Sequence, residues 1–332
     1  MTYAALHRRK FIAISAAAAG LSALPFGTRS RAGPAHLVGW RGTFLGAVAT
    51  LRVYDTDKSR ADELVRRVAA EAHRLEAIFS LYQEGSVLSE LNRHGVLANP
   101  PSELSELLFS CNHYWEVTGG MFDPTVQALW RCYVESFSTR GEGPTVGERE
   151  AALRLIGWQQ VRFDRDRVVL GRRGMGLTLN GIAQGYVTDR IVADLRSSGI
   201  ESCLVDMGEI RTLGRKPDGE PWSVAIEDAS EKTSVSMPVL NKAVATSGAY
   251  GFRFDAQGQC NHLFDPRTGL CAGPSKTITV VSDSATAADA LSTAFTLMED
   301  GAVSTALALA PGTRAYSIEL GKMREITARQ PA

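Results

Sequence analysis

Two oxygen-bearing side chains, Asp289 and Thr293, lie four residues apart in an alanine-rich stretch of the sequence. The apolar spacing predicts a helix from about Thr286, and residues four apart project from the same face of a helix. A carboxylate and a hydroxyl side by side can supply two ligands to a hard cation such as Mg²⁺, with backbone, water and phosphate completing the shell. Taken alone, an aspartate near a helix start is equally explained by the helix dipole.

Two further segments combine glycine with polar groups at the ends of predicted elements. Gly181-Ile182-Ala183-Gln184-Gly185-Tyr186 stands where a helix is expected to begin, and its glycines permit close backbone approach to a phosphate. His262 precedes the turn signature Asp265-Pro266-Arg267-Thr268-Gly269, and a histidine there can act as acid or base near neutral pH. Each segment alone has a plain structural explanation as a turn.

The elements that must position these groups alternate between hairpin-like strands and a few well-formed helices, which predicts an α+β fold. We expect strands within 42–54, 161–163, 168–170, 203–205, 222–226, 243–246 and 277–281. Helices are expected from Ser59, with Ser59 and Asp62 as a capping box, from Ser102 to 118–120, and up to Ser198-Gly199. The polar stretch 137–148 is expected to be a surface loop. No dinucleotide or P-loop fingerprint stands at a strand-to-helix turn.

Composition excludes several classes of protein. The chain of 332 residues is 44% hydrophobic and 22% charged, which are ordinary globular values. Its formal net charge is zero, but the first 32 residues carry five basic and no acidic side chains, so the rest is mildly acidic. Nucleic-acid binding requires a basic surface, which a mildly acidic chain does not offer, so nucleic acid is not expected as a partner.

The N-terminus has the layout of an export signal. The basic group Arg8-Arg9-Lys10 is followed by a short apolar run over 12–24 and a small-residue site at 30–32. The paired arginines predict a twin-arginine signal, hence a signal peptide over 1–32, one domain over 33–332 and a periplasmic location. No other stretch approaches the roughly 20 apolar residues of a membrane span, so the processed chain is not expected to be an integral membrane protein.

The five cysteines show no metal-ligand spacing and no CxxC pair, which favours mostly buried free thiols. Cys260 and Cys271 are the two that could bridge in an oxidising compartment.

Read together, the segments between Thr43 and Met298 resemble the ApbE family of FAD:protein FMN transferases. Six elements occur in the family's order: Ile78–Tyr82 with Ser86–Asn92, Thr118–Thr125 (T-G-G-x-F-D-P-T), Gly181–Tyr186 (G-I-A-K-G-Y), Ala245–Gly248 (A-T-S-G), His262–Gly269 (H-x-x-D-P-R-T-G) and Ala288–Thr293 (A-D-A-x-x-T). Each is short, and their order along the chain gives the resemblance its weight. It implies an ApbE-like, T-fold-related architecture of mixed sheets with packed helices.

The resemblance also implies roles for single residues. Mg²⁺ would be held by Asp289, Thr293 and the backbone carbonyl of Gly181. His262 would be the base for the acceptor hydroxyl, with a rate that rises with pH near the ordinary histidine pKa of about 6.5. FAD, the FMN donor, would be contacted by Leu45, Tyr82, Met121, Phe122, Asp123, Thr178, Gln184 and the backbone of Leu263.

The implied reaction moves FMN from FAD onto a threonine hydroxyl of an acceptor flavoprotein and releases AMP. The sequence departs from the family at Thr178 and Gln184, where charged residues are usual, and at 206–209, where Asp-Met-Gly-Glu replaces N-x-G-G. The signal and the Gln184 segment are similar to the NosX subgroup, which implies a NosR-like acceptor in nitrous oxide reduction. Two alternatives keep the fold: an FAD pyrophosphatase that uses water, and a flavin carrier without turnover.

Overall fold

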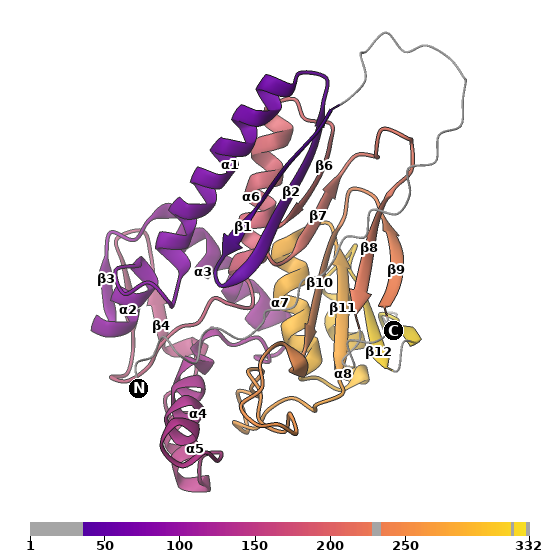
Figure 1. Cartoon of the computed structure of the whole chain (residues 1–332). Coiled ribbons are helices and arrows are strands. Elements are labelled where there is room, and N and C mark those ends of the chain that lie inside the picture. Colours follow the sequence, from indigo (N-terminus) through magenta and orange to yellow (C-terminus); the bar gives the residue numbers. More distant parts are fainter. Residues whose placement is uncertain (1–35, 228–233, 320–321, 330–332) are drawn as a thin grey trace.

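The computed structural model of the chain describes residues 36–227, 234–319 and 322–329, so the predicted signal over 1–32 lies outside the described part (Figure 1). Its largest sheet is antiparallel throughout and has the order β1-β2-β6-β7-β10-β11-β12-β13. The strands are β1 (His36–Phe44), β2 (Ala47–Asp55), β6 (Ser202–Asp206), β7 (Ile210–Leu213), β10 (Ala243–Gly248), β11 (Thr277–Ser282), β12 (Arg314–Glu319) and β13 (Lys322–Ile326).

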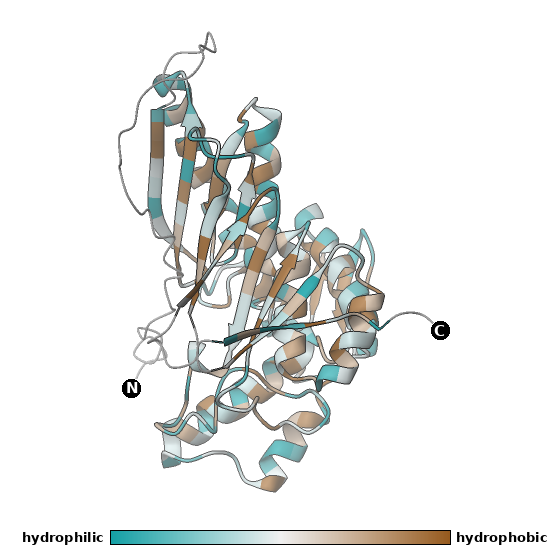
Figure 2. Ribbon diagram, turned by 90° about the vertical axis from the view of Figure 1, so that its right-hand side faces the viewer, coloured by the Kyte–Doolittle hydropathy of each residue, from teal (hydrophilic) through white to brown (hydrophobic). Residues whose placement is uncertain are grey.

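Helices cover one face of this sheet and a hairpin covers the other. α1 (Lys58–Phe79), α6 (Ala183–Ser197) and α7 (Ala285–Thr296) pack on the helical face. The hairpin β8 (Trp222–Glu227) and β9 (Ser234–Val239) packs on the opposite face, where Trp222 and Val224 meet side chains of the large sheet. Burial alternates along β2, as expected for a strand whose two faces differ. In Figure 2 hydrophobic residues are concentrated on the central strands and hydrophilic ones on outer turns and loops.

A smaller part of the chain flanks one end of the large sheet. It contains α2 (Val87–His94), α3 (Ser102–Val117) and the three-stranded sheet β3-β5-β4, made of Val96–Ala98, Arg167–Leu170 and Val161–Phe163. The short turn η2 (Pro124–Val126) leads into α4 (Gln127–Arg140), which pairs with α5 (Val146–Leu153), and the two helices project from the body in Figure 1. The remaining elements are η3 (Trp158–Gln160), η4 (Ala249–Gly251) and α8 (Asp300–Ala308).

The α+β class and most predicted elements are confirmed, and two local predictions are wrong. α1 begins one residue before Ser59, because the Asp57 carboxylate caps it by accepting the Arg60 N–H at 3.1 Å. The expected loop over 137–148 is mostly helical. There Thr145 and Glu148 form a capping box that starts α5, and only residues 141–145 connect the helices. Within the described residues, none of the helices combines the length and apolarity needed to cross a bilayer.

A close backbone approach joins the N-terminal turns of α6 and α7. A Cβ added at Gly185 would lie 2.2 Å from the carbonyl oxygen of Ala285, so only glycine fits at this position. The Gly185 N–H also donates to Asp289 Oδ2 at 3.0 Å. This contact fixes the two helices that carry the predicted cation ligands.

We therefore expect Gly185→Ala to destabilise the chain by about 2 kcal/mol or more, because backbone must move to make room for the methyl group. Gly147→Ala is the matched control: it also lies in a helix, but nothing surrounds its Cβ position within 4 Å. There the lower entropy of alanine should raise stability by at most about 1 kcal/mol. Urea unfolding of both variants measures the difference, and an unchanged midpoint for Gly185→Ala would contradict the packing argument.

Candidate functional site

A cavity of about 1170 Å³ opens where the β1–β2 turn, the ends of α1 and β10, and the N-terminal turn of α6 meet α7. All predicted site residues except Leu45 line it. They are Tyr82, Met121, Phe122, Asp123, Thr178, Gly181, Gln184, His262, Leu263, Asp289 and Thr293. These residues come from five separate segments of the sequence, and the fold brings them to one space.

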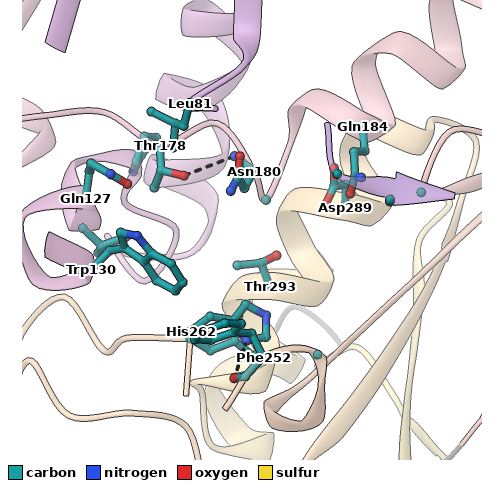
Figure 3. Close-up of a pocket in the computed structure, with 18 of the residues that line it drawn as sticks. Leu81, Gln127, Trp130, Thr178, Asn180, Gln184, Phe252, His262, Asp289 and Thr293 are labelled. Atoms are coloured by element: carbon teal, nitrogen blue, oxygen red, sulfur yellow. Dashed lines mark hydrogen bonds between the residues drawn. The ribbon is translucent and has the colours of Figure 1, made fainter. Parts of the chain in front are cut away.

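Figure 3 shows how the labelled side chains surround this space. Gln127, Trp130 and Thr178 lie on one side, Gln184 and Asp289 on another, and His262 with Phe252 on a third. Thr293 projects from α7 between the last two groups in this view. The cavity therefore has one wall of aromatic and amide groups, one of carboxylate and amide, and one with an imidazole.

The predicted cation ligands are neighbours in the structure. A Cβ at Gly181 would lie 2.9 Å from Thr293 Oγ1, so the Gly181 backbone lies directly against the threonine hydroxyl. The Ser247 hydroxyl oxygen lies 3.4 Å from Thr293 Oγ1 and 2.8 Å from the Ser292 hydroxyl oxygen. A cluster of hydroxyl oxygens thus surrounds the start of the Gly181 segment.

Sequence reasoning missed two of the three acidic side chains that form the wall near α6. Asp206 ends β6, Glu209 follows in the turn to β7, and both line the cavity with Asp289; we call these three residues the carboxylate wall. All are less than 9% exposed. The signal available in the sequence was an acid at the end of a buried strand, followed by Met207-Gly208 and a second acid.

The turn that carries these acids is fixed against α6. Gly208 has φ of +106°, and a Cβ there would lie 2.4 Å from the amide of Gln184. Its N–H donates to Asp206 Oδ1 at 3.0 Å, which holds that carboxylate in place. Gln184 therefore shapes the turn as well as lining the cavity.

Burial makes it energetically unfavourable to ionise the three acids of the carboxylate wall. Desolvation raises the pKa of Asp206 to about 6, and it raises the pKa of Asp289 and of Glu209, where neighbouring acids add to the effect. No lysine or arginine of the described residues contributes to any of these shifts. Glu209 Oε2 is buried and has no hydrogen-bond partner in the described part of the chain.

This donor set fits a hard cation whose remaining ligands would come from water or a bound phosphate. The described residues contain no group of three His, Cys, Asp or Glu side chains with the geometry of a complete metal site. Asp289, the Thr293 hydroxyl and the Gly181 backbone are oxygen donors on the lining of one cavity, and Glu209 adds a buried oxygen that has no hydrogen-bond partner among the described residues. Mg²⁺ characteristically binds through one or two carboxylates and completes its shell with water and substrate phosphate.

His262 is held as a neutral base. Its Nδ1 lies 3.3 Å from the Phe252 carbonyl oxygen, and since a carbonyl only accepts, Nδ1 carries the proton and Nε2 keeps its lone pair. Desolvation lowers the pKa of His262 to about 4, which corrects the expectation of a pKa near 6.5. The imidazole is therefore uncharged throughout the neutral range.

Two predicted residues have supporting positions. The Asp123 carboxylate lines the cavity, but its oxygens accept from the Thr125 N–H and hydroxyl at 2.8 and 2.5 Å and from the Trp158 N–H at 3.2 Å. It therefore fixes the loop before α4. Leu45 has a buried side chain outside the cavity lining, and its N–H donates to Glu76 Oε1 at 2.9 Å in the β1–β2 turn.

Other lining residues were missed by sequence reasoning. The rings of Trp130 and Phe252 lie 5.1 Å apart and both face the cavity, where aromatic faces can stack on a planar ligand. Asn180 donates to the Tyr82 hydroxyl at 3.2 Å and links the end of α1 to the segment before α6. Trp130 and Phe252 are distant in sequence, so no local pattern joins them.

We expect the His262 imidazole to show no titration between pH 5.5 and 8, because its pKa lies near 4 in the folded chain. The unfolded chain, with a histidine pKa of about 6.5, then binds more protons than the folded chain between these values. Stability from this residue is therefore full above about pH 6.5 and is lost as the pH falls toward 4. Proton NMR of the ring, assigned by its loss in His262→Gln, measures the pKa, and a midpoint near 6.5 would refute the desolvated geometry.

The sequence matches the family model described as the ApbE family over residues 45–316. Several similar proteins are named FAD:protein FMN transferase. The one from Chlamydia pneumoniae is 28% identical over 67% of this chain and 72% of its own length. The one from Treponema pallidum (strain Nichols) is 29% identical over 75% of each chain.

Solved structures show the same fold. Flavin transferase ApbE from Vibrio cholerae aligns with a TM-score of 0.76 at 24% identity, covering 89% of this chain and 98% of that one. The ApbE protein of Thermotoga maritima aligns with a TM-score of 0.73 at 27% identity, covering 87% and 97%. With the family pattern matched along most of its length and its motif residues gathered around one cavity, the chain belongs to the ApbE family.

Proposed function

We propose that the chain is an FAD:protein FMN transferase, which moves FMN from FAD to a threonine hydroxyl of another protein and releases AMP. The observation that carries this proposal is the convergence of the family's motif residues on a single cavity. Relatives that carry this name match the chain over two thirds or more of its length.

The cavity has the size and lining for this substrate. At about 1170 Å³ it is larger than the roughly 300–1,000 Å³ of ordinary small-molecule pockets, which suits a dinucleotide together with an acceptor side chain. Tyr82, Trp130 and Phe252 offer aromatic faces for the planar flavin and adenine rings. The Gly181 segment at the start of α6 suits the diphosphate, since helix N-termini favour anions.

Binding of the FAD diphosphate next to the carboxylate wall would require a cation. The FAD diphosphate is anionic, and buried acids on the cavity wall would repel it unless a cation lies between them. In this proposal Asp289, Thr293 and the Gly181 carbonyl would hold Mg²⁺, and Glu209, once ionised beside the cation, would strengthen its binding. Bound there, Mg²⁺ would neutralise charge on the phosphate oxygens during transfer.

The chain's own residues then position the reactants and move one proton. The acceptor hydroxyl forms a bond to the FMN phosphorus, the phosphoanhydride bond to AMP breaks, and AMP leaves with that bridging oxygen. His262 Nε2 takes the hydroxyl proton, because its Nδ1–H is already committed to the Phe252 carbonyl. Positioning supplies much of the rate, as in other phosphoryl transfers.

We further propose that the enzyme acts in the periplasm after twin-arginine export, on a NosR-like membrane flavoprotein of nitrous oxide reduction. The Arg8-Arg9-Lys10 signal layout supports the route. Resemblance of the Gln184 segment to the NosX subgroup supports the acceptor. An Arg8→Lys, Arg9→Lys double change leaving export intact would remove the support for this route.

The full chain incubated with FAD, Mg²⁺ and a NosR-type flavin-acceptor domain should yield an acceptor heavier by one FMN and an equal amount of AMP. Intact-mass spectrometry measures the first product and chromatography the second. AMP without acceptor labelling would identify a pyrophosphatase, and bound FAD without AMP a carrier; either result contradicts the transferase proposal.

His262→Ala separates chemistry from binding in the same assay. Loss of the general base should reduce transfer by about 10²- to 10⁴-fold while FAD affinity stays near that of the parent chain. If FAD affinity and transfer fall by the same factor, His262 instead has a structural role in ordering the 262–269 turn.

A further inference from the structure

Three of the five cysteines gather outside the catalytic machinery, in an aromatic cluster between α4 and the segment 252–271. Cys132, Cys260 and Cys271 are partly buried there against Tyr133, Phe137, Phe254 and Phe264. Cys111 and Cys203 are fully buried in the main core. The cluster therefore holds every partly accessible thiol of the described residues.

The backbone brings Cys260 and Cys271 to adjacent passes of the chain. Phe264 and Cys271 form an antiparallel bridge, and the Ala272 N–H donates to the Leu263 carbonyl at 2.8 Å. Asn261 Nδ2 donates to the Ala272 carbonyl at 2.8 Å, and the Cys271 thiol donates to the Asn261 carbonyl at 3.3 Å. Asn261 and Ala272, which directly follow the two cysteines, thus bond one pass of the chain to the other.

The two thiols lie in the same aromatic cluster. The partner of the Cys271 thiol is the carbonyl of Asn261, the residue that directly follows Cys260. Cys132 lies on α4 instead, and no hydrogen bond of the described residues joins its thiol to either of the other two cysteines. The hydrogen bonds between the passes that carry Cys260 and Cys271 therefore single out these two as the pair.

We propose that Cys260 and Cys271 form a disulfide that fixes the segment carrying His262 and Leu263 against the cavity. The bond would close a short loop around these two cavity-lining residues, so it would restrict the one wall that carries the base. Export to an oxidising compartment would supply the conditions for it.

The oxidation is a disulfide exchange. The two thiols lose two electrons and two protons, an Sγ–Sγ bond forms, and the disulfide of an oxidant such as a dithiol oxidase or oxidised glutathione is reduced to two thiols. Burial raises the pKa of the Cys260 thiol to about 12 and raises that of Cys271, so few thiolates exist at neutral pH in the folded chain. The reaction should therefore be slow with air and faster while the segment is still folding.

Peptide mapping tests the pairing directly. The full chain, refolded with oxidised glutathione, unfolded in iodoacetamide and digested without reductant, should give one linked peptide that joins Cys260 to Cys271. Cys111, Cys132 and Cys203 should all be alkylated. A wild-type map in which Cys260 and Cys271 are both alkylated, or in which Cys132 is linked to either, would overturn the proposal.

Thermal melting tests what the bond does. Reductant should lower the Tm of the oxidised chain by about 5 °C or more, as expected for opening a short loop, and should weaken FAD binding measured by flavin fluorescence. The double variant Cys260→Ser, Cys271→Ser should respond to reductant in neither assay. Cys132→Ser, from the same cluster, should respond as the parent chain does. If the chain contains the disulfide but its Tm and FAD affinity do not change with reductant, the bond does not fix the segment that carries His262 and Leu263.

Discussion

The arrangement of the site depends on one contact, the approach of α6 to α7 at Gly185. Because this residue has no side chain, the first turn of α6 lies directly on the start of α7, and its N–H reaches the Asp289 carboxylate. The same approach places Gly181 against Thr293 and brings the β6–β7 turn, packed on Gln184, beside Asp289. Three motifs that are far apart in the sequence become one surface through this glycine.

The physical consequence of that surface is a group of three acids buried together, with no lysine or arginine of the described residues lowering their pKa values. Asp206, Glu209 and Asp289 are desolvated together, and the raised pKa of each expresses the cost of ionising them there. A fold that keeps such a wall gains from a ligand that carries positive charge to it. A cation shared with an anionic diphosphate would stabilise both the acids and the diphosphate. The wall that carries His262 adds no charge, because its imidazole is neutral.

Periodicity in the sequence predicted the elements with strong local signals. The apolar spacing of α6, the hairpin of β4 and β5 and the glycine stop of α3 were all recognised, since each is determined by neighbouring residues. The stretch over 137–148 was misread because it is polar, and Phe137 is held by a distant partner, Phe254, at a ring distance of 5.3 Å. Short elements such as β7 and β13 depend on pairing within the sheet and carry little signal of their own.

The site residues that belong to sequence motifs were predictable. The pKa values and unpaired groups that arise from burial in the folded chain were not. His262 and Asp289 were identified from their segments, but the low pKa of His262 follows from its enclosure beside Phe252. Glu209 was noticed only as a departure from the family pattern, because its importance arises from an oxygen left unpaired in the folded wall. Trp130 and Phe252 meet only through the fold.

The dependence of FAD binding on Mg²⁺ tests this account most directly, because coupling between two ligands is reciprocal and needs no turnover. Flavin fluorescence titrations in chelator and in saturating Mg²⁺ should show FAD bound about tenfold or more tightly with the cation, in the range of typical couplings. The effect should vanish in Asp289→Asn and shrink in Glu209→Gln, both of which keep the side-chain shape. Equal FAD affinity with and without Mg²⁺ in the parent chain would contradict the claim that the carboxylate wall binds the diphosphate through a cation.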